Sequence, residues 1–322
     1  MGVKKMERFD LNRGINLGGW MSQCDYSKER LDGFIKASDI ERIASWGMDH
    51  IRLPLDYNVI QNEDGSMKED GLCRVDSAVG LAKKNGLRIV LDLHKTRGYS
   101  FDKGENEAGF FSDEALQGSF YGIWRTLAGR YGSDPDNIVF ELLNEVNEES
   151  DIDAWNRISN ECIRQIRKDA PETFILVGSY HGNSVKAVKD LSSPFDDHVI
   201  YNFHCYEPIR FTHQGAYWID DEFPSLRMPF AESGVNEDFF ARMFEPAIEK
   251  ASREGTCLYC GEYGVIDVVS PEDTLAWYKA IHKAFRKYGI GRAAWSYKEM
   301  DFGLSDPRMD GIRDELLEVL RE

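Results

Sequence analysis

Short apolar runs alternate with amphipathic stretches along almost the whole chain, and this alternation constrains the fold more than any other feature of the sequence. Eight runs have the length and the apolar content of buried strands, and they span residues 14–17, 50–53, 88–93, 137–143, 173–177, 199–203, 258–261 and 292–295. Stretches with helical periodicity separate most of them, at about 38–46, 76–84, 114–131, 154–168, 237–253, 272–287 and 311–320. Strands that alternate with helices predict βαβ units and a parallel sheet.

Eight strand–helix units in 322 residues average about 40 residues each, which predicts an α/β fold of the (β/α)₈ type, the TIM barrel. The sequence contains no low-complexity segment or internal linker, so we expect one catalytic domain over residues 1–322 with an elaborated connection at about 207–235. Pro54 is expected to end the second strand. The competing fold is an open, doubly wound sheet, but residues 16–20 (NLGGW) lack the glycine spacing of a dinucleotide-binding turn.

Charge and composition narrow the range of partners. The formal net charge of −17 disfavours nucleic acid and anionic membranes, and it suits either a neutral polymer such as a polysaccharide or simple solubility. No apolar run approaches the roughly 20 residues of a membrane span. Residues 1–10 lack the apolar core of a secretory signal, which favours the cytoplasm over secretion with the signal already removed. We expect a monomer.

The six cysteines do not suggest a disulfide framework in a chain of this size. Cys257 and Cys260 form a C-x-x-C pair, but no second pair completes a zinc site. We expect both to be buried free thiols.

Polar side chains follow the predicted strands at the points where the apolar runs end. In a TIM barrel these points gather at the mouth that carries the active site, whereas the opposite rim serves stability. The residues placed there are Arg52, His94, Asn144, Glu145, His204, Tyr206, Glu262 and Trp295.

Two of these residues, Glu145 and Glu262, follow strands four and seven, which can face each other across a barrel mouth. Retaining glycoside hydrolysis uses two carboxyl groups about 5–5.5 Å apart, one as nucleophile and one as acid/base. Their surroundings must move their pKa values in opposite directions. Arg52 is a natural partner to keep a nucleophile ionised, and Tyr206 can donate a hydrogen bond to it.

The ordered set of motifs resembles glycoside hydrolase family 5 from about Gly14 to Asp301. The matching segments are 15–20 (INLGGW), 52–54 (RLP), 92–94 (DLH), 143–145 (LNE), 203–206 (FHCY), 261–264 (GEYG) and 294–297 (AWSY). The chain is most similar to the compact single-domain bacterial endo-β-1,4-glucanases of that family. The resemblance implies a retaining hydrolase of cellulose-type or mixed-linkage β-glucan, without cofactor or metal.

The resemblance also implies a role for each residue at the mouth. Glu145 would be the acid/base and Glu262 the nucleophile, with Arg52 and Tyr206 orienting Glu262. Asn144 would bind the sugar 2-hydroxyl. The three remaining residues would surround the sugar ring, two as hydrogen-bonding groups and one as an apolar platform: His94, His204 and Trp295.

The chain departs from the family pattern at two places. Many members carry a second histidine after the first, but His94 is followed by Lys95. The 207–235 connection is abbreviated, and its aromatic residues suit either a cleft wall or ordinary loop packing: Phe211, His213, Tyr217 and Trp218. Trp20, after the first strand, either lines the cleft or packs in the core.

Other functions remain open at this stage. A β-mannanase or an exo-acting β-glucosidase would use the same carboxylates. A metal-dependent barrel hydrolase could use His94, His204 and the glutamates, although such enzymes usually carry a His-x-His on an early strand. A carbohydrate-binding protein without catalysis is the last alternative, and the presence of both glutamates with Asn144 speaks against it.

Overall fold

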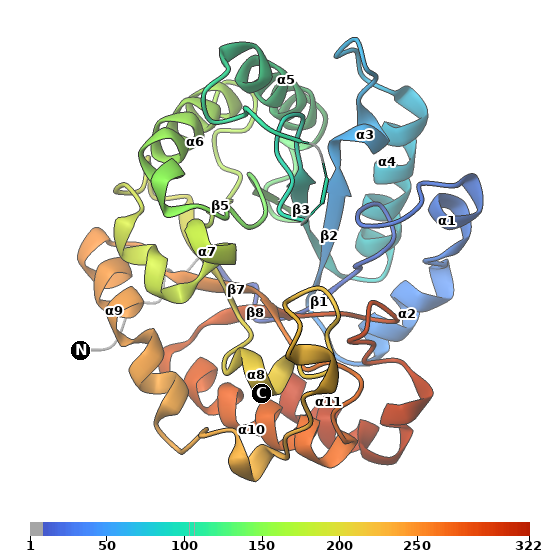
Figure 1. Cartoon of the computed structure of the whole chain (residues 1–322). Helices are drawn as coiled ribbons and strands as arrows, with labels where there is room; N and C mark the ends of the chain where they lie inside the picture. The colour runs from blue at the N-terminus through green and yellow to red at the C-terminus, as the bar shows by residue number, and fades with distance from the viewer. Residues whose placement is uncertain (1–8, 103, 106) are drawn as a thin grey trace.

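The computed structural model describes residues 9–102, 104–105 and 107–322. In this part of the chain eight parallel strands form a closed barrel in sequence order, and β8 pairs with β1 to complete it (Figure 1). The strands are β1 (Arg13–Asn16), β2 (His50–Asp56), β3 (Arg88–Lys95), β4 (Ile138–Glu141), β5 (Ile175–Val177), β6 (Val199–Cys205), β7 (Leu258–Tyr263) and β8 (Gly291–Ala294). The predicted (β/α)₈ fold is confirmed.

Helices surround the barrel and connect successive strands. The α-helices are α1 (Lys28–Gly33), α2 (Ala37–Ser45), α3 (Tyr57–Ile60), α4 (Glu69–Lys84), α5 (Glu114–Tyr131), α6 (Ile152–Ile166), α7 (Tyr180–Asn183), α8 (Ile209–Thr212), α9 (Phe239–Glu254), α10 (Pro271–Tyr288) and α11 (Arg313–Arg321). The 3₁₀ helices are η1 (Glu149–Asp151), η2 (Val185–Asp190), η3 (Phe223–Ser225), η4 (Phe230–Glu232) and η5 (Pro307–Ile312). None of these described helices has both the length and the apolar character that crossing a membrane requires.

The predicted strands and long helices are present with shifts of a few residues at most ends, but two boundaries were wrong. Helix α4 begins at Glu69, seven residues before the predicted start, and Gly71 lies in its first turn. A Cβ on Gly71 would lie 2.0 Å from the carbonyl oxygen of Val59, so the glycine permits the close approach of α3 to α4.

Strand β2 also continues through Pro54 to Asp56, contrary to the prediction. The amide of Leu17, just after β1, donates to the carbonyl of Arg52, so the backbone groups of Arg52 point toward β1. Along β2, every second residue from Arg52 has its backbone groups on this same side. Pro54 is the next such residue, and it lies beyond the end of β1 at Asn16. Its missing N–H therefore costs no hydrogen bond of the strand ladder.

The connection between β5 and β6 has only the short α7 and η2 in place of a long helix. His181, Gly182 and Asn183 all have positive φ values, of 52°, 63° and 55°. This left-handed turn cannot belong to a right-handed α-helix. Its amides bond to the segment after β4, since His181 donates to Asn147 and Gly182 donates to Val146.

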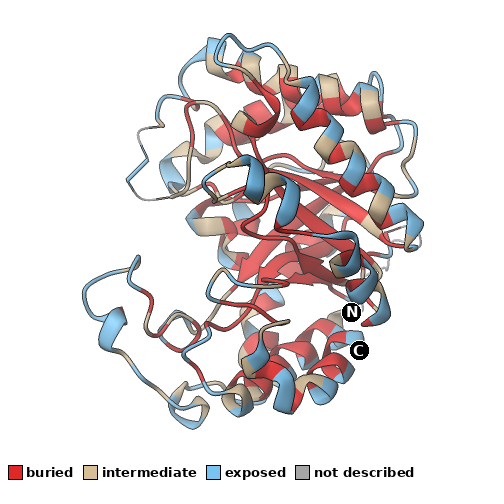
Figure 2. Ribbon diagram, turned by 90° about the vertical axis from the view of Figure 1, so that its right-hand side faces the viewer, coloured by how far each residue is buried: buried red, intermediate tan, exposed pale blue. Residues whose placement is uncertain are grey.

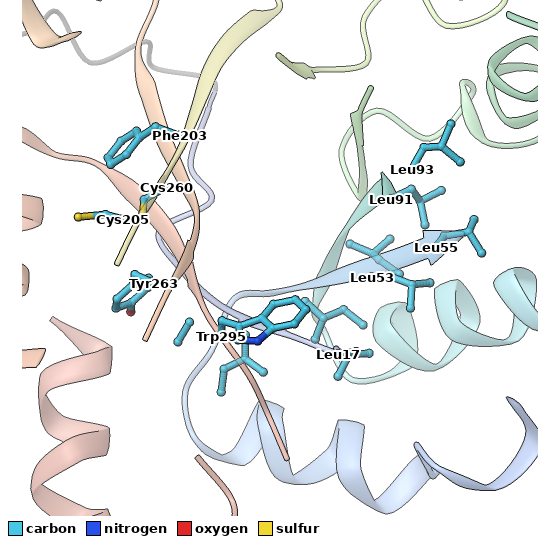
Figure 3. Close-up of a cluster of buried hydrophobic side chains, with 14 of the residues drawn as sticks. Leu17, Leu53, Leu55, Leu91, Leu93, Phe203, Cys205, Cys260, Tyr263 and Trp295 are labelled. Carbon is cyan, nitrogen blue, oxygen red and sulfur yellow. The ribbon is translucent and has the colours of Figure 1, made fainter. Parts of the chain in front are cut away.

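Outward-facing strand residues form the main apolar core against the helices. Figure 3 shows Leu53 and Leu55 of β2 beside Leu91 and Leu93 of β3. The helices contribute large aromatic side chains to this layer, and Trp124, Trp155 and Trp277 are fully buried. Figure 2 shows that exposure is concentrated on outer helix faces and projecting loops.

Trp20 belongs to this packed layer and does not line the cleft. It is 6% exposed, and its indole N–H donates to the carbonyl of Leu31 at 2.8 Å. All six cysteines are free thiols, with Cys260 buried and Cys257 partly buried.

The barrel interior is layered along its axis. A small apolar cluster closes the end at which the strands begin, and it consists of Phe9, Leu11, Val90, Val139, Phe174, Leu176, Ile200, Tyr259 and Ala293. Two residues further along the strands, the inward positions become polar, with Arg52, Asp92, Glu141 and Asn202 all fully buried. The apolar cluster therefore supports a polar layer beneath the mouth.

Gly291, the first residue of β8, tests how closely the chain packs at the closed end of the barrel. A Cβ there would lie 1.8 Å from the carbonyl oxygen of Leu11, which is backbone and cannot rotate away. We expect Gly291→Ala to lower the free energy of unfolding by about 2–3 kcal/mol, measured by urea unfolding. The matched control is Gly129→Ala on α5, where nothing lies within 4 Å, and it should raise stability by roughly 0.5–1 kcal/mol. Equal effects of the two substitutions would contradict this packing.

Candidate active site

Seven of the eight residues predicted for the mouth lie together at the carboxyl ends of the strands. Arg52 does not end its strand as predicted, because β2 continues for four more residues to Asp56. The eight residues surround a cavity of about 530 Å³, a volume within the usual range for small-molecule sites. Six of the eight line it directly, and these are His94, Asn144, Glu145, Tyr206, Glu262 and Trp295. The other two, Arg52 and His204, lie buried behind them.

Glu262, on β7, is held by two donors from different strands. Its Oε1 accepts from Nη1 of Arg52 at 2.6 Å, and its Oε2 accepts from the hydroxyl of Tyr206 at 2.8 Å. Both oxygens are therefore bound as acceptors, which is the arrangement that favours an ionised carboxylate. The side chain is 6% exposed and faces the cavity.

Glu145 follows β4 and has a different environment. Its Oε1 lies 2.8 Å from Nδ1 of His204, and burial raises the pKa of this carboxyl above its ordinary value of 4.5. A raised pKa keeps a carboxyl protonated to higher pH, as an acid catalyst requires. The surroundings of Glu145 and Glu262 thus differ in the sense that acid/base and nucleophile need.

The backbone at Glu145 is held in an uncommon conformation, with a φ of 38°. A non-glycine residue in the left-handed region costs of order 1–3 kcal/mol and is found mostly at functional sites. The Tyr99 hydroxyl donates to the Glu145 carbonyl at 2.5 Å, and the left-handed turn of α7 bonds to the next two residues. Tyr99 is a supporting residue that the sequence pattern did not reveal.

Both histidines of the site are neutral near neutral pH. Burial lowers the pKa of His94 and of His204 to about 4 in each case. Nδ1 of His94 bonds to the carboxylate of Asp92, which fixes the ring orientation and leaves Nε2 as an acceptor. These rings therefore act through hydrogen bonds and not as fixed positive charges.

Arg52 forms the centre of the buried polar layer. Its guanidinium donates to both oxygens of Glu141, at 2.7 and 2.8 Å, and lies 3.0 Å from Asp92. It also donates to Asn16 at 2.9 Å and to Asn144 at 2.8 Å. Burial raises the pKa values of the Asp92 and Glu141 carboxyls.

Asp92, Glu141 and Asn16 were not assigned to the site from the sequence. A signal was available, because each is a polar residue at an inward position of an otherwise apolar strand. The period-two alternation of a strand places such a residue inside the barrel.

Asn144 is oriented by Arg52. Because its Oδ1 accepts from the guanidinium, its Nδ2 is turned away, and this nitrogen has no hydrogen-bond partner among the described residues. Asn144 lines the cavity, so an unpaired buried donor is available there to an oxygen of a ligand.

Trp295 supplies a flat wall. Its ring stacks parallel to that of His94, with centroids 5.9 Å apart and an interplanar angle of 2°. Gly18 permits this position, since a Cβ there would lie 2.7 Å from the indole. An aromatic face of this kind suits the C–H face of a sugar ring.

Two loops contribute the outer walls. From the 207–235 connection, His213, Tyr217 and Trp218 line the cavity, whereas Phe211 is buried against Phe230 and serves loop packing.

The loop after β3 brings Phe101 and Asp102 to the cavity. Lys95, at the position where many relatives have histidine, is buried and pairs with Asp102 at 2.6 Å and with Glu105 at 2.7 Å. It therefore anchors the wall of the cavity and does not line it.

A divalent metal would find a poor set of free ligands here. Glu145, His204 and Glu262 each offer a ligand atom, and these atoms lie within 4.8 Å of one another. In the described part of the chain, however, both oxygens of Glu262 are already bound by donors, and the guanidinium of Arg52 brings a positive charge to the same carboxylate. This donor set fits carboxylate chemistry better than metal chemistry.

Comparison with known proteins identifies the family of the chain. The family model described as cellulase (glycosyl hydrolase family 5) matches residues 11–301. Cellodextrinase A of Ruminococcus flavefaciens is 59% identical over 280 residues, which are 87% of this chain and 83% of that protein. Endoglucanase C of Acetivibrio thermocellus is 37% identical over 334 aligned positions, covering 95% of this chain and 97% of that protein.

Among solved structures, a mutant form of Thermotoga maritima Cel5A in complex with cellobiose superposes with a TM-score of 0.83 at 25% identity, covering 97% of each chain. The family match spans most of the chain and contains all eight predicted site residues. A cellulase is a hydrolase of β-linked glucan, so the predicted enzyme class and substrate class are both confirmed. The chain belongs to glycosyl hydrolase family 5, the cellulase family, and is an O-glycosyl hydrolase.

Proposed function

We propose that this glycoside hydrolase cleaves β-1,4-linked glucan with retention of anomeric configuration, with Glu262 as nucleophile and Glu145 as acid/base. The observation that carries the proposal is the short distance between these two carboxyl groups. One carboxyl oxygen of Glu145 and one of Glu262 lie within 4.8 Å of each other. This spacing suits direct attack, because an inverting enzyme holds its carboxyl groups about 6.5–9.5 Å apart to admit a water. The glucan specificity is supported by the names of the similar proteins, a cellodextrinase and an endoglucanase.

The reaction would proceed in two displacements. In the first, Glu262 attacks the anomeric carbon while Glu145 gives its proton to the leaving glycosidic oxygen, which forms a covalent glycosyl-enzyme and frees one sugar fragment. In the second, Glu145 removes a proton from water, the water oxygen attacks the anomeric carbon, and the Glu262 carboxylate leaves. Arg52 and Tyr206 would hold Glu262 ionised in the free enzyme, and the unpaired Nδ2 of Asn144 would bind the 2-hydroxyl.

The partner in this proposal is an oligo- or polysaccharide, and the enzyme acts as a monomer of one catalytic domain. The net charge of −17 disfavours an anionic partner such as nucleic acid or a membrane surface. A neutral glucan faces no such repulsion.

Glu262→Ala tests the nucleophile. We expect loss of cellopentaose hydrolysis by at least roughly 10⁴-fold, since the covalent step has no substitute, while the circular dichroism spectrum stays that of the wild type.

In the wild type, NMR should show the β anomer as the first product. An initial α anomer would refute retention, and turnover of mannopentaose in place of cellopentaose would identify a β-mannanase.

The raised pKa of Glu145 predicts the alkaline side of the pH profile. The acid must carry its proton, so kcat/KM should fall as pH rises through a pKa above 4.5. In Glu145→Ala this decline should disappear, with cellopentaose hydrolysis reduced about 10²–10⁴-fold. The first step on a dinitrophenyl β-cellobioside should remain fast, because that leaving group needs no proton. An unchanged alkaline decline in the variant would remove Glu145 from the role.

The exposed aromatic wall predicts how longer substrates bind. Tyr217 is 79% exposed at the edge of the cavity, where it can contact a sugar unit without supporting the fold. We expect Tyr217→Ala to raise KM for cellopentaose roughly three- to tenfold, about 1 kcal/mol for one lost aromatic contact, with kcat little changed. Phe195→Ala is the matched control, because Phe195 is 40% exposed and is not among the residues that line the cavity. Equal effects of the two substitutions would contradict a role for Tyr217 in binding.

A further inference from the structure

Glu141 is a fully buried carboxylate that the two-displacement mechanism does not use. It is the last residue of β4, four positions before Glu145, and it is not among the residues that line the cavity. Its Oε2 accepts from Nε of Arg52 at 2.7 Å, and its Oε1 accepts from Nη2 of Arg52 at 2.8 Å and from Asn202 at 2.7 Å. It does not line the cavity, so an effect on the reaction passes through the residues that it binds, and Arg52 is the one of these that contacts Glu262.

The bidentate pair fixes the direction of the whole guanidinium. Two parallel bonds to one carboxylate define both the plane and the rotation of an arginine fork. With Nε and Nη2 set by Glu141, Nη1 points to Glu262 at 2.6 Å, and the second N–H of Nη2 points to Asn144 at 2.8 Å. One buried carboxylate therefore fixes the direction of the N–H groups that bind Glu262 and Asn144.

Glu141 also shares the positive charge of Arg52. The carboxylates in direct contact with the guanidinium are Asp92 from β3 and Glu141 from β4, which are fully buried, and Glu262 from β7, which faces the cavity. Other titratable groups near this layer are His94, Glu145, His204 and Tyr206, and also Asp56 and Tyr259. Removing the charge of Glu141 would leave Arg52 a stronger partner for Glu262.

We propose that Glu141 is a positioning residue of the reaction, which aims Arg52 at Glu262 and Asn144 and limits how strongly Arg52 stabilises the ionised form of Glu262. The inference rests on the proposed function, because it takes Glu262 as the nucleophile. A nucleophile that is held too strongly as an anion is less basic and attacks more slowly, so the charge of Glu141 would support reactivity as well as geometry.

Two variants separate charge from geometry. Glu141→Gln keeps the shape but removes the charge, and it places an amide N–H₂ against a donor of Arg52. We expect kcat/KM for cellopentaose to fall roughly 10–100-fold. We also expect the loss of kcat/KM at low pH, its acidic decline, to occur about 0.5–1 pH unit lower than in the wild type. Glu141→Asp keeps the charge but shortens the reach, so kcat should fall about tenfold or more with the acidic decline in place.

The matched control is Asp196→Asn. Asp196 forms a similar bidentate pair with Arg167, at 2.6 and 3.0 Å, outside the barrel. Loss of this pair should lower the melting temperature and leave the pH profile unchanged. If Glu141→Gln behaved like this control, losing stability with an unmoved acidic decline, Glu141 would be merely structural and the proposal would be wrong.

The rate of covalent labelling distinguishes failure of this inference from failure of the proposed function. Dinitrophenyl 2-deoxy-2-fluoro-β-cellobioside should label Glu262 of the wild type, and Glu141→Gln should slow labelling roughly 10–100-fold with the same pH shift. No label on Glu262 in the wild type would overturn the assignment of the nucleophile. Labelling at an equal rate and equal pH dependence in both proteins would overturn the role of Glu141 alone. If Glu141→Gln does not fold, an unchanged kcat in Glu141→Asp is sufficient to overturn it.

Discussion

The guanidinium of Arg52 lies inside the barrel with all of its N–H groups directed at acceptors on other strands. Its N–H groups donate to Asn16 of β1, to Glu141 and Asn144 at the end of β4 and to Glu262 of β7, and it forms an ion pair with Asp92 of β3. A charge buried this deeply is tolerated only when it is paired and fully hydrogen-bonded. The strands of the barrel must therefore keep their register for Arg52 to remain stable, and this same register brings Glu262 to the cavity.

The interior below and above this layer follows from the same constraint. The apolar cluster at the closed end excludes water from beneath the charged groups, which strengthens their interactions. Above the layer, the cavity exposes only the groups that a substrate can contact, among them Glu145, Glu262 and the unpaired amide nitrogen of Asn144. The site is thus rigid where the carboxylates lie and formed by loops only at its outer walls.

The two carboxyl groups of the site are distinguished by what surrounds them. Glu262 accepts from Arg52 and Tyr206, whereas Glu145 is partly buried beside a neutral His204, and its pKa is raised. Glu145 also has a left-handed backbone conformation, with a φ of 38°, and bonds from Tyr99 and α7 support this segment. Support for catalysis therefore extends to segments that contain no catalytic group.

The sequence by itself determined the barrel, the order of its strands and the residues at the mouth, because hydrophobic periodicity and the ends of apolar runs are local properties. It did not reveal that β2 continues through Pro54, because the tolerance of this proline depends on where the neighbouring β1 ends. The alternation of strand residues places Asp92 and Glu141 inside the barrel, but it could not reveal what they do, because their role comes from Arg52 on another strand. Tertiary structure alone decided these features, since they depend on contacts between residues that are distant in the chain and adjacent only when the barrel closes.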